Sequence, residues 1–284
     1  MYALRGSGAS VAVLADLTDS TSWPTQSSFG LSEGIDMIGA TVAGDTIANA
    51  TTTLSTAGVD SYSFKVMLGD WVYWLDTYNN ATRLISPATF VAGLLANLSP
   101  QNSPLNKPLQ GIVGTQKSGV ASGAPGIYSE ADIQALVAAR IDVIANPSVG
   151  GPYFSCRIGH NTSSNPLTWS DSYTRMTNYI AATLDAGMGQ FVGQVENPNL
   201  LASVRDTIGA FCQTLWEQGL IGNPAGTVPY SVECDTLDNP IQRAALGYMQ
   251  ADVQVQSLPS AEKFLVNMQG GASVQVTRQS VALA

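Results

Sequence analysis

The segment Gly111–Ser118 (GIVGTQKS) comes close to the sequence of a phosphate-binding loop. In such a loop, a glycine directly before the lysine lets the backbone wrap around the phosphate groups of a nucleotide. Here Gln116 occupies that position, directly before Lys117. The segment therefore lacks the residue on which the phosphate contact depends, and we expect neither a nucleotide site nor any other cofactor.

The other candidates for catalysis or metal binding are single residues or incomplete motifs. His160 is the only histidine, and a general base or a zinc ligand needs partners that no G-x-S-x-G or metal motif supplies here. Asp16 and Asp19 could form a carboxylate pair, but their Ser/Thr-rich surroundings favour turn and capping roles. The segment Asp76–Asn80 lacks the glycine and the distal glutamate of a calcium loop. We expect no catalytic residue and no metal site, and we interpret His160 as a hydrogen-bonding loop residue.

The composition is that of a globular chain with few charges. The 284 residues are 45% hydrophobic and only 12% charged, which fits one large or two ordinary domains. A net charge of −9 argues against nucleic acid or anionic lipid as a partner, because phosphate binding requires clustered Lys and Arg. No apolar run reaches the ~20 residues of a membrane span. The cysteines, three in number, are interpreted as isolated thiols in a reducing cytoplasm.

Helices are predicted where caps flank a periodic segment. Asp45–Ala57 ends at Gly58, and Ser129 with Asp132 resembles a capping box at the start of Glu130–Arg140. In the second half, which begins near residue 166, helices are expected at Ser170–Met188 and from Pro198 to Gln218. The second of these carries one apolar stripe, formed by Leu201, Val204, Ile208, Phe211 and Leu215.

Strands are predicted from short apolar or alternating runs. Residues 1–44 are expected to form loops around one strand at Val11–Leu14. Tyr62–Leu68 and Trp71–Leu75 are predicted to pair as a hairpin across the Gly69-Asp70 step, and Gly111–Gly126 is expected to be an exposed loop. Two further strands are expected at Ile141–Ala145 and Tyr230–Cys234.

The C-terminal part of the chain alternates apolar and polar residues with a period of two, around Gly270-Gly271. This pattern predicts a β ribbon with one apolar face. A free hairpin is marginal in water, so the ribbon must dock, either on its own domain or as a strand added to a neighbouring subunit. The candidate self-assembly residues are Val253, Val255, Lys263, Phe264, Val266, Met268, Val274 and Val276.

One segment resembles a known protein family. Ser86–Thr115 (SPATFVAGLLANLSPQNSPLNKPLQGIVGT) combines an apolar helix that starts at Pro87 with a proline-rich polar loop. It resembles the conserved loop of contractile tail sheath proteins of phages and tailocins. The segments Ile141–Pro147, Cys156–Pro166 and the arginine-bearing Tyr173–Ile180 are similar to the parts that follow in that family.

The resemblance implies an α/β fold with a mixed β-sheet core flanked by helices, a smaller α+β C-terminal domain and a terminal β ribbon. It implies a sheath core domain of subtilisin-like topology at 1–165, a C-terminal sheath domain at 166–250 and an exchange arm at 251–284. The implied function is a structural subunit of a phage contractile tail sheath. It would polymerise helically around the tail tube and contract to drive the tube through the host envelope.

The resemblance also implies partners and a location. The partners would be further copies of the chain, the tail tube protein, and baseplate and tail terminator proteins, without nucleic acid or membrane insertion. The chain would be made in the host cytoplasm and act in the virion. Sheath proteins usually carry an N-terminal arm, so this chain, which starts at Met1 with a Gly/Ser-rich segment, is expected to be a fragment or a reduced member. The alternatives are another self-assembling virion or cage component, or an α/β enzyme without a visible motif.

Overall fold

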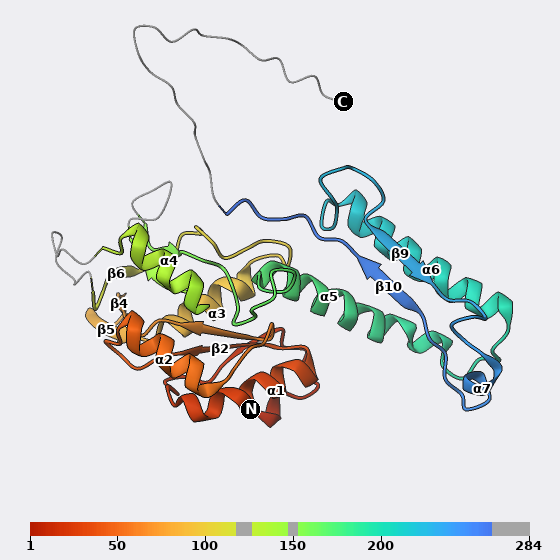
Figure 1. Cartoon of the computed structure of the whole chain (residues 1–284), viewed down its shortest axis with the longest axis horizontal. Helices are drawn as coiled ribbons and strands as arrows, with labels where there is room; N and C mark the ends of the chain where they lie inside the picture. The colour runs from red at the N-terminus through yellow and green to blue at the C-terminus, as the bar shows by residue number, and fades with distance from the viewer. Residues whose placement is uncertain (118–126, 147–152, 263–284) are drawn as a thin grey trace, which may run out of the picture.

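The computed structural model describes residues 1–117, 127–146 and 153–262, which form two units (Figure 1). The larger unit contains α1–α4 and β1–β8. Helix α5 (Asp171–Met188) leads from this unit to the smaller one, which contains α6, α7, β9 and β10. The expected α/β class, with a smaller α+β part toward the C-terminus, is confirmed.

A parallel three-stranded sheet lies at the centre of the larger unit. Its strands follow in the order β1 (Val11–Val13), β2 (Asp36–Ala40) and β3 (Phe64–Met67). Asp142 adds a parallel bridge to Met67 at the end of β3. Parallel neighbours require long crossover connections, and two helices supply them, namely α1 (Trp23–Glu33) and α2 (Ile47–Ala57).

Residues 1–44 contain more regular structure than the single predicted strand, because α1 and β2 also lie there. The prediction missed α1 for a physical reason. Its buried face includes Gln26, Ser27 and Gly30 beside Trp23 and Phe29, so it shows little of the apolar periodicity by which helices are recognised. Gly30 faces β2 so closely that an added Cβ would lie 2.6 Å from the carbonyl oxygen of Ile35.

The predicted hairpin between the strands at 62–68 and 71–75 is wrong, because β3 pairs with β2 and β4 (Val72–Asp76) belongs to another sheet. In that sheet β4 lies between two antiparallel partners, β5 (Ala81–Ile85) and β6 (Ile112–Thr115). The predicted loop 111–126 therefore contains a strand. Gly69 allows the chain to cross between the sheets, since a Cβ there would lie 1.8 Å from the carbonyl oxygen of Val42.

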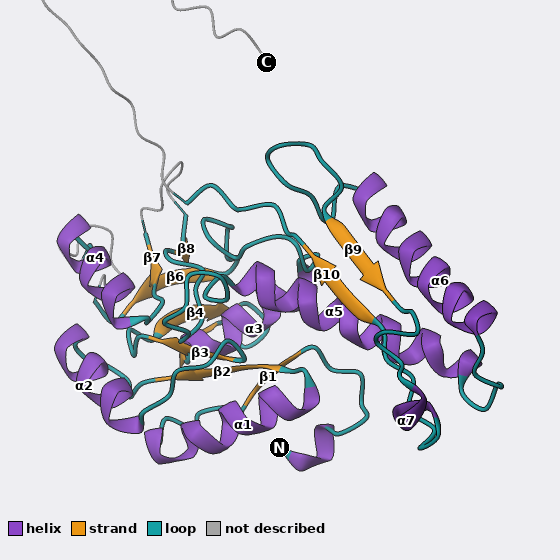
Figure 2. Cartoon of the chain, turned by 45° about the vertical axis from the view of Figure 1, so that its right-hand side comes forward, coloured by secondary structure: helices purple, strands orange, loops and turns teal. Residues whose placement is uncertain are grey.

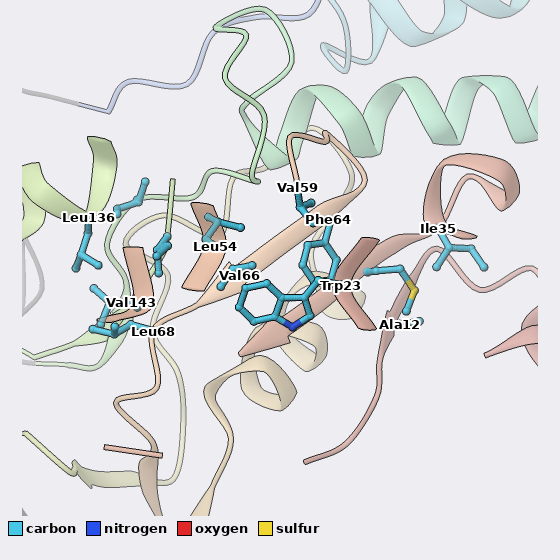
Figure 3. Close-up of a cluster of buried hydrophobic side chains, with 14 of the residues drawn as sticks. Ala12, Trp23, Ile35, Leu54, Val59, Phe64, Val66, Leu68, Leu136 and Val143 are labelled. Carbon is cyan, nitrogen blue, oxygen red and sulfur yellow. The ribbon is translucent and has the colours of Figure 1, made fainter. Parts of the chain in front are cut away.

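Helices cover both faces of the parallel sheet, which therefore buries both sets of alternating side chains (Figure 2). On one face, Trp23 of α1 packs against Phe64 of β3, with ring centroids 5.9 Å apart (Figure 3). Helices α2 and α4 (Glu130–Ala139) add Leu54 and Leu136 to the same cluster. On the opposite face, α3 (Pro87–Asn97) packs against all three strands.

The short elements that complete the larger unit are the 3-10 helices Tyr2–Leu4 and Ser20–Ser22 and the paired strands β7 (Ile144–Ala145) and β8 (Ser155–Cys156). Several local predictions are confirmed here. Gly58 ends α2 with a φ of 63°, as predicted, while the cap at its start is Thr46, which was not predicted. Ser129 and Asp132 form the capping box of α4.

The smaller unit consists of α6 (Pro198–Glu217), β9 (Tyr230–Glu233), α7 (Ile241–Ala244) and β10 (Asp252–Val255), and the 3-10 turn Gly189–Phe191 links it to α5. The predicted apolar stripe of α6 is confirmed: Leu201, Val204, Ile208 and Leu215 are buried, and Phe211 is partly buried. Strand β10 pairs with β9 inside this unit. The domain limits at residues 165 and 250 stay predictions.

Candidate assembly site

The smaller unit carries a sheet of only two strands. Strands β9 and β10 are antiparallel, from the pair Tyr230–Val255 to the pair Glu233–Asp252. Within the described ranges, no further strand pairs with either of them. The outer edge of each strand therefore offers its main-chain N–H and C=O groups to a partner strand.

The structure places two of the eight predicted self-assembly residues in β10. The side chains of Val253 and Val255 are partly buried and pack on their own subunit, against the clusters that α5 and α6 form. Asp252 and Gln254 alternate with them and are exposed. The other six, Lys263, Phe264, Val266, Met268, Val274 and Val276, lie outside the described residues. The role of all eight in self-assembly stays a prediction.

Sequence reasoning missed the pairing of β10 with β9. It treated Asp252–Gln256 as part of a ribbon with the residues that follow Lys263. A signal was present, since Tyr230–Glu233 and Asp252–Val255 both alternate with a period of two. The two strands are separated by an 18-residue connection that contains α7, whereas hairpins are usually recognised from much shorter loops. The pairing was therefore not predicted.

A buried ionic cluster joins α5 to the larger unit. Lys65 Nζ on β3 lies 2.7 Å from Asp142 Oδ2 and 2.7 Å from Asp171 Oδ2, and it donates to the carbonyl oxygen of His160 at 2.8 Å. Asp142 also accepts hydrogen bonds from four backbone N–H groups, those of Val143, Arg157, Ile158 and Gly159. Since Asp171 opens α5, this cluster fixes the helix on the core.

Lys65 and Asp142 hold each other in their charged forms. Burial alone lowers the pKa of Lys65, but Asp142 and Asp171 outweigh burial and keep that pKa above its ordinary value. Burial alone raises the pKa of Asp142, but Lys65 and the backbone donors outweigh it and keep that pKa below its usual range. The cluster is an internal tie whose groups are fully engaged with one another.

Asp36 and Arg175 lie at the edge of this cluster. Burial and the nearby Asp171 carboxylate raise the pKa of Asp36 to about 8, against the opposing effects of Arg175 and Lys65. Arg175 Nη2 donates to the carbonyl oxygens of Leu95 and Leu98 at 2.6 and 2.7 Å. Arg175 therefore ties α5 to the C-terminal end of α3.

The residues that suggested chemistry have structural partners. Asp19 caps a 3-10 turn through the N–H of Thr21, as predicted, and Asp16 lies in a turn with a φ of 58°. Asp76 accepts hydrogen bonds from Asn79 and pairs with Arg83 at 2.8 Å. The cysteines Cys156, Cys212 and Cys234 are free and buried. In the described residues, no cluster of three or more His, Cys, Asp or Glu side chains could hold a metal ion.

His160 lies in a loop, as predicted, and contacts another segment. Its ring stacks on Trp169 with centroids 4.8 Å apart, and its Nε2 lies 2.9 Å from Glu262 Oε1. The residues that the phosphate-loop comparison singled out lie elsewhere, with Ile112–Thr115 forming β6. Gln116 and Lys117 of that segment line a cavity at the end of β3.

A cavity of about 430 Å³ lies where β3 ends and α2 and α4 begin. Among its charged lining residues, Lys117 Nζ lies 3.6 Å from Asp132 Oδ2, while Asp45 binds Thr46 and Asn49 through Oδ1. Asp70 accepts hydrogen bonds from the backbone N–H of Lys117 and from the hydroxyl of Tyr128, and Lys117 Nζ lies 3.8 Å from the centroid of the Tyr128 ring. This arrangement stabilises the loop ends and assembles no catalytic group. No helix in the described ranges is long and apolar enough to cross a membrane.

No protein-family model and no curated protein matches the sequence. Solved structures do match. The chain is similar to one in the sheath complex of the PVC extracellular contractile injection system in its contracted state, with a TM-score of 0.71 and 15% identity over 93% of this chain and 71% of that one. A chain of the anti-feeding prophage baseplate matches with a TM-score of 0.68 and 15% identity, over 87% of this chain and 63% of that one.

The sheath tail protein of Desulfitobacterium hafniense is also similar, with a TM-score of 0.58 and 16% identity over 82% of this chain and 51% of that protein. The chain thus spans about half to 71% of the length of these proteins. These likenesses show that it has the fold of contractile sheath proteins. The family resemblance inferred from Ser86–Thr115 is confirmed at the level of the fold.

Proposed function

We propose that this chain is a structural subunit of a contractile tail sheath, which polymerises helically around a tail tube and contracts to drive the tube through a host envelope. The observation that carries the proposal is the two-stranded sheet β9–β10, whose outer edges lack partner strands among the described residues. This sheet belongs to a chain whose fold matches that of a sheath-complex chain over 93% of its length.

Strand addition supplies the linkage between copies. The segment 263–284 continues the period-two pattern that β10 begins, so we propose that it pairs with the β9–β10 sheet of a neighbouring copy. A strand as long as β10, which has four residues, would form about four main-chain hydrogen bonds at roughly 1 kcal/mol each. Because the pairing uses main-chain atoms, it tolerates changes in packing between the larger units while they slide.

Strand addition between copies produces an assembly that can keep growing at its ends. A contact in which the donor segment and the acceptor sheet are different surfaces is head-to-tail, and such contacts give helical polymers when they do not close into rings. Contraction is then a shift between two packings of nearly rigid subunits, which the buried tie of Lys65, Asp142 and Asp171 keeps intact. Tube, baseplate and terminator proteins would be the partners of the polymer, and no catalytic step is part of this role.

Electron microscopy of the concentrated protein tests the proposal. We expect the full chain to form tubes and a variant that lacks Phe264–Ala284 to stay dispersed while keeping its circular dichroism spectrum and thermal midpoint. The matched control replaces the same residues with a scrambled segment of equal composition, which removes the period-two pattern and should also stay dispersed.

A synthetic peptide of residues 264–276 provides an independent measurement. It should bind the truncated subunit and slow the growth of tubes by the full chain, while a scrambled peptide should do neither. Normal tube growth by the truncated variant would refute strand addition. Closed shells or single rings from the full chain would instead support a cage or a baseplate component.

A further inference from the structure

Between β10 and residue 263, the chain crosses from the smaller unit back to the larger one. At its start, Gln256 donates its N–H to the carbonyl oxygen of Pro229 at 2.7 Å and accepts from the N–H of Gly222 at 3.0 Å. At its end, Glu262 binds His160 at the base of α5. The segment 256–262 therefore connects the two units a second time, independently of α5 (Figure 1).

The segment lies on a surface shaped for it. Leu258 packs so closely on Gly222 that a Cβ there would lie 3.1 Å from the Leu258 side chain. Beside it is a cavity of about 160 Å³ that Gln101, Ser172, Tyr173 and Leu220 also line. Leu258 nevertheless stays 46% exposed. Among the described residues, the hydrogen bonds of the segment are those of Gln256 and Glu262, at its two ends.

The two residues of the His160–Glu262 contact differ in how firmly the rest of the protein holds them. The ring of His160 is 8% exposed, stacks on Trp169, and belongs to a residue whose carbonyl accepts from the buried Lys65. Glu262, in contrast, has a side chain that is 32% exposed and forms one contact with the ring. A single, partly solvated contact of this kind can open without disturbing the core.

We infer that residues 256–262 form a releasable strap, which holds the start of the C-terminal segment on its own subunit through the His160–Glu262 contact and lengthens the reach of that segment when it opens. This inference rests on the proposed function. While the strap is closed, the chain is attached as far as Glu262; once it opens, the last attached residues are those at the end of β10. Seven extended residues span roughly 25 Å, so a joined neighbour could move by a comparable distance without losing its strand.

Distances between two spin labels test the strap. The native cysteines are buried, so cysteines introduced at the exposed positions Leu167 and Ala261 can be labelled selectively. We expect a narrow distribution of distances in the free subunit. His160→Phe, which keeps the stack on Trp169 but removes Nε2, and Glu262→Ala should both broaden it and lengthen its mean by about 10 Å or more. Glu233→Ala, at an exposed position of β9, is the matched control and should change nothing.

The same label pair is then measured in wild-type tubes before and after contraction, and the mean distance should increase in one of the two states. A broad distribution in the free wild-type subunit, or one that neither variant changes, would overturn the strap. A closed strap in both tube states would overturn its release. If no tubes form, the proposed function fails, while the free subunit still decides whether the strap exists.

Discussion

Lys65 on β3 and Asp171 at the start of α5 form a buried ion pair with 2.7 Å between Nζ and Oδ2, although 106 positions separate them in the sequence. Their side chains are 3% and 6% exposed. A buried charge is tolerated only when it is paired and hydrogen-bonded, and Asp142 with the carbonyl of His160 completes the set around Lys65. This pair therefore fixes the start of α5 on the core.

Replacing Lys65 with methionine should lower the free energy of unfolding by about 3–5 kcal/mol, because Asp142 and Asp171 would stay buried without their cation. Urea denaturation followed by circular dichroism measures the loss. Lys107→Met, at an exposed position, is the control and should change the value by less than about 0.5 kcal/mol. The double variant Lys65→Met, Asp171→Asn should recover part of the loss. Equal effects of the two lysine variants would contradict the role of the buried pair.

The pKa of about 8 for Asp36 predicts a pH dependence of stability. The folded chain keeps this proton up to about pH 8, while the unfolded chain releases it near its ordinary pKa of about 4. The folded state binds more protons between these values, so the free energy of unfolding falls as the pH rises through this window. Asp36→Asn should remove that fall and stabilise the chain above pH 8 by at least about 1.4 kcal/mol, the equivalent of one pKa unit.

Denaturation curves collected from pH 5 to pH 9 check this prediction for Asp36. The control is Asp185→Asn, an exposed carboxyl on α5, which should leave the slope between pH 5 and pH 8 as it is in the wild type. If the Asp36→Asn variant kept the slope of the wild type, another group would have to carry the pH dependence.

The sequence predicted those elements whose signals are local. Gly58 ends α2, and Ser129 with Asp132 starts α4, because capping depends on residues within one turn of the helix end. The helix after Ser86 was predicted for the same reason, since proline fits a first turn. Such signals need no knowledge of the tertiary structure.

The choice of strand partners could not be predicted from the same pattern. The runs that became β3 and β4 alternate correctly around Gly69-Asp70, but β3 pairs with β2 and β4 with β5 and β6. Pairing depends on which faces the helices cover, and that is decided by contacts far apart in the sequence. Lys65 within the apolar run Phe64–Met67 was a usable signal, since a lysine in a buried strand requires carboxylates. Its spacing did not identify Asp142 and Asp171.

The close approach of Gly69 to the backbone of Val42 leads to a further prediction. Because a Cβ at this position would meet the carbonyl oxygen of Val42 at 1.8 Å, Gly69→Ala should force the backbone apart and destabilise the chain by about 1–3 kcal/mol or more. Gly93 is the matched control, since it lies exposed within α3 with open space around it, and Gly93→Ala should stabilise by about 0.5–1 kcal/mol. Thermal unfolding compares the two. A tolerated alanine at 69 would contradict the close crossing of the sheets.

Arg175 connects the segment Tyr173–Ile180 to the segment Ser86–Thr115. Its guanidinium donates to the carbonyls of Leu95 and Leu98 at the C-terminal end of α3. Arg175→Met should cost about 3 kcal/mol, because the buried carbonyl of Leu95 and the partly buried carbonyl of Leu98 lose a charged donor. Hydrogen exchange of the last turn of α3 should also accelerate, which a general loss of stability alone would not confine to that turn. Arg205→Met, which removes only the exposed pair with Asp206, is the control and should change stability by less than about 0.5 kcal/mol. Unchanged exchange at the end of α3 in the Arg175 variant would rule out this tie between α5 and α3.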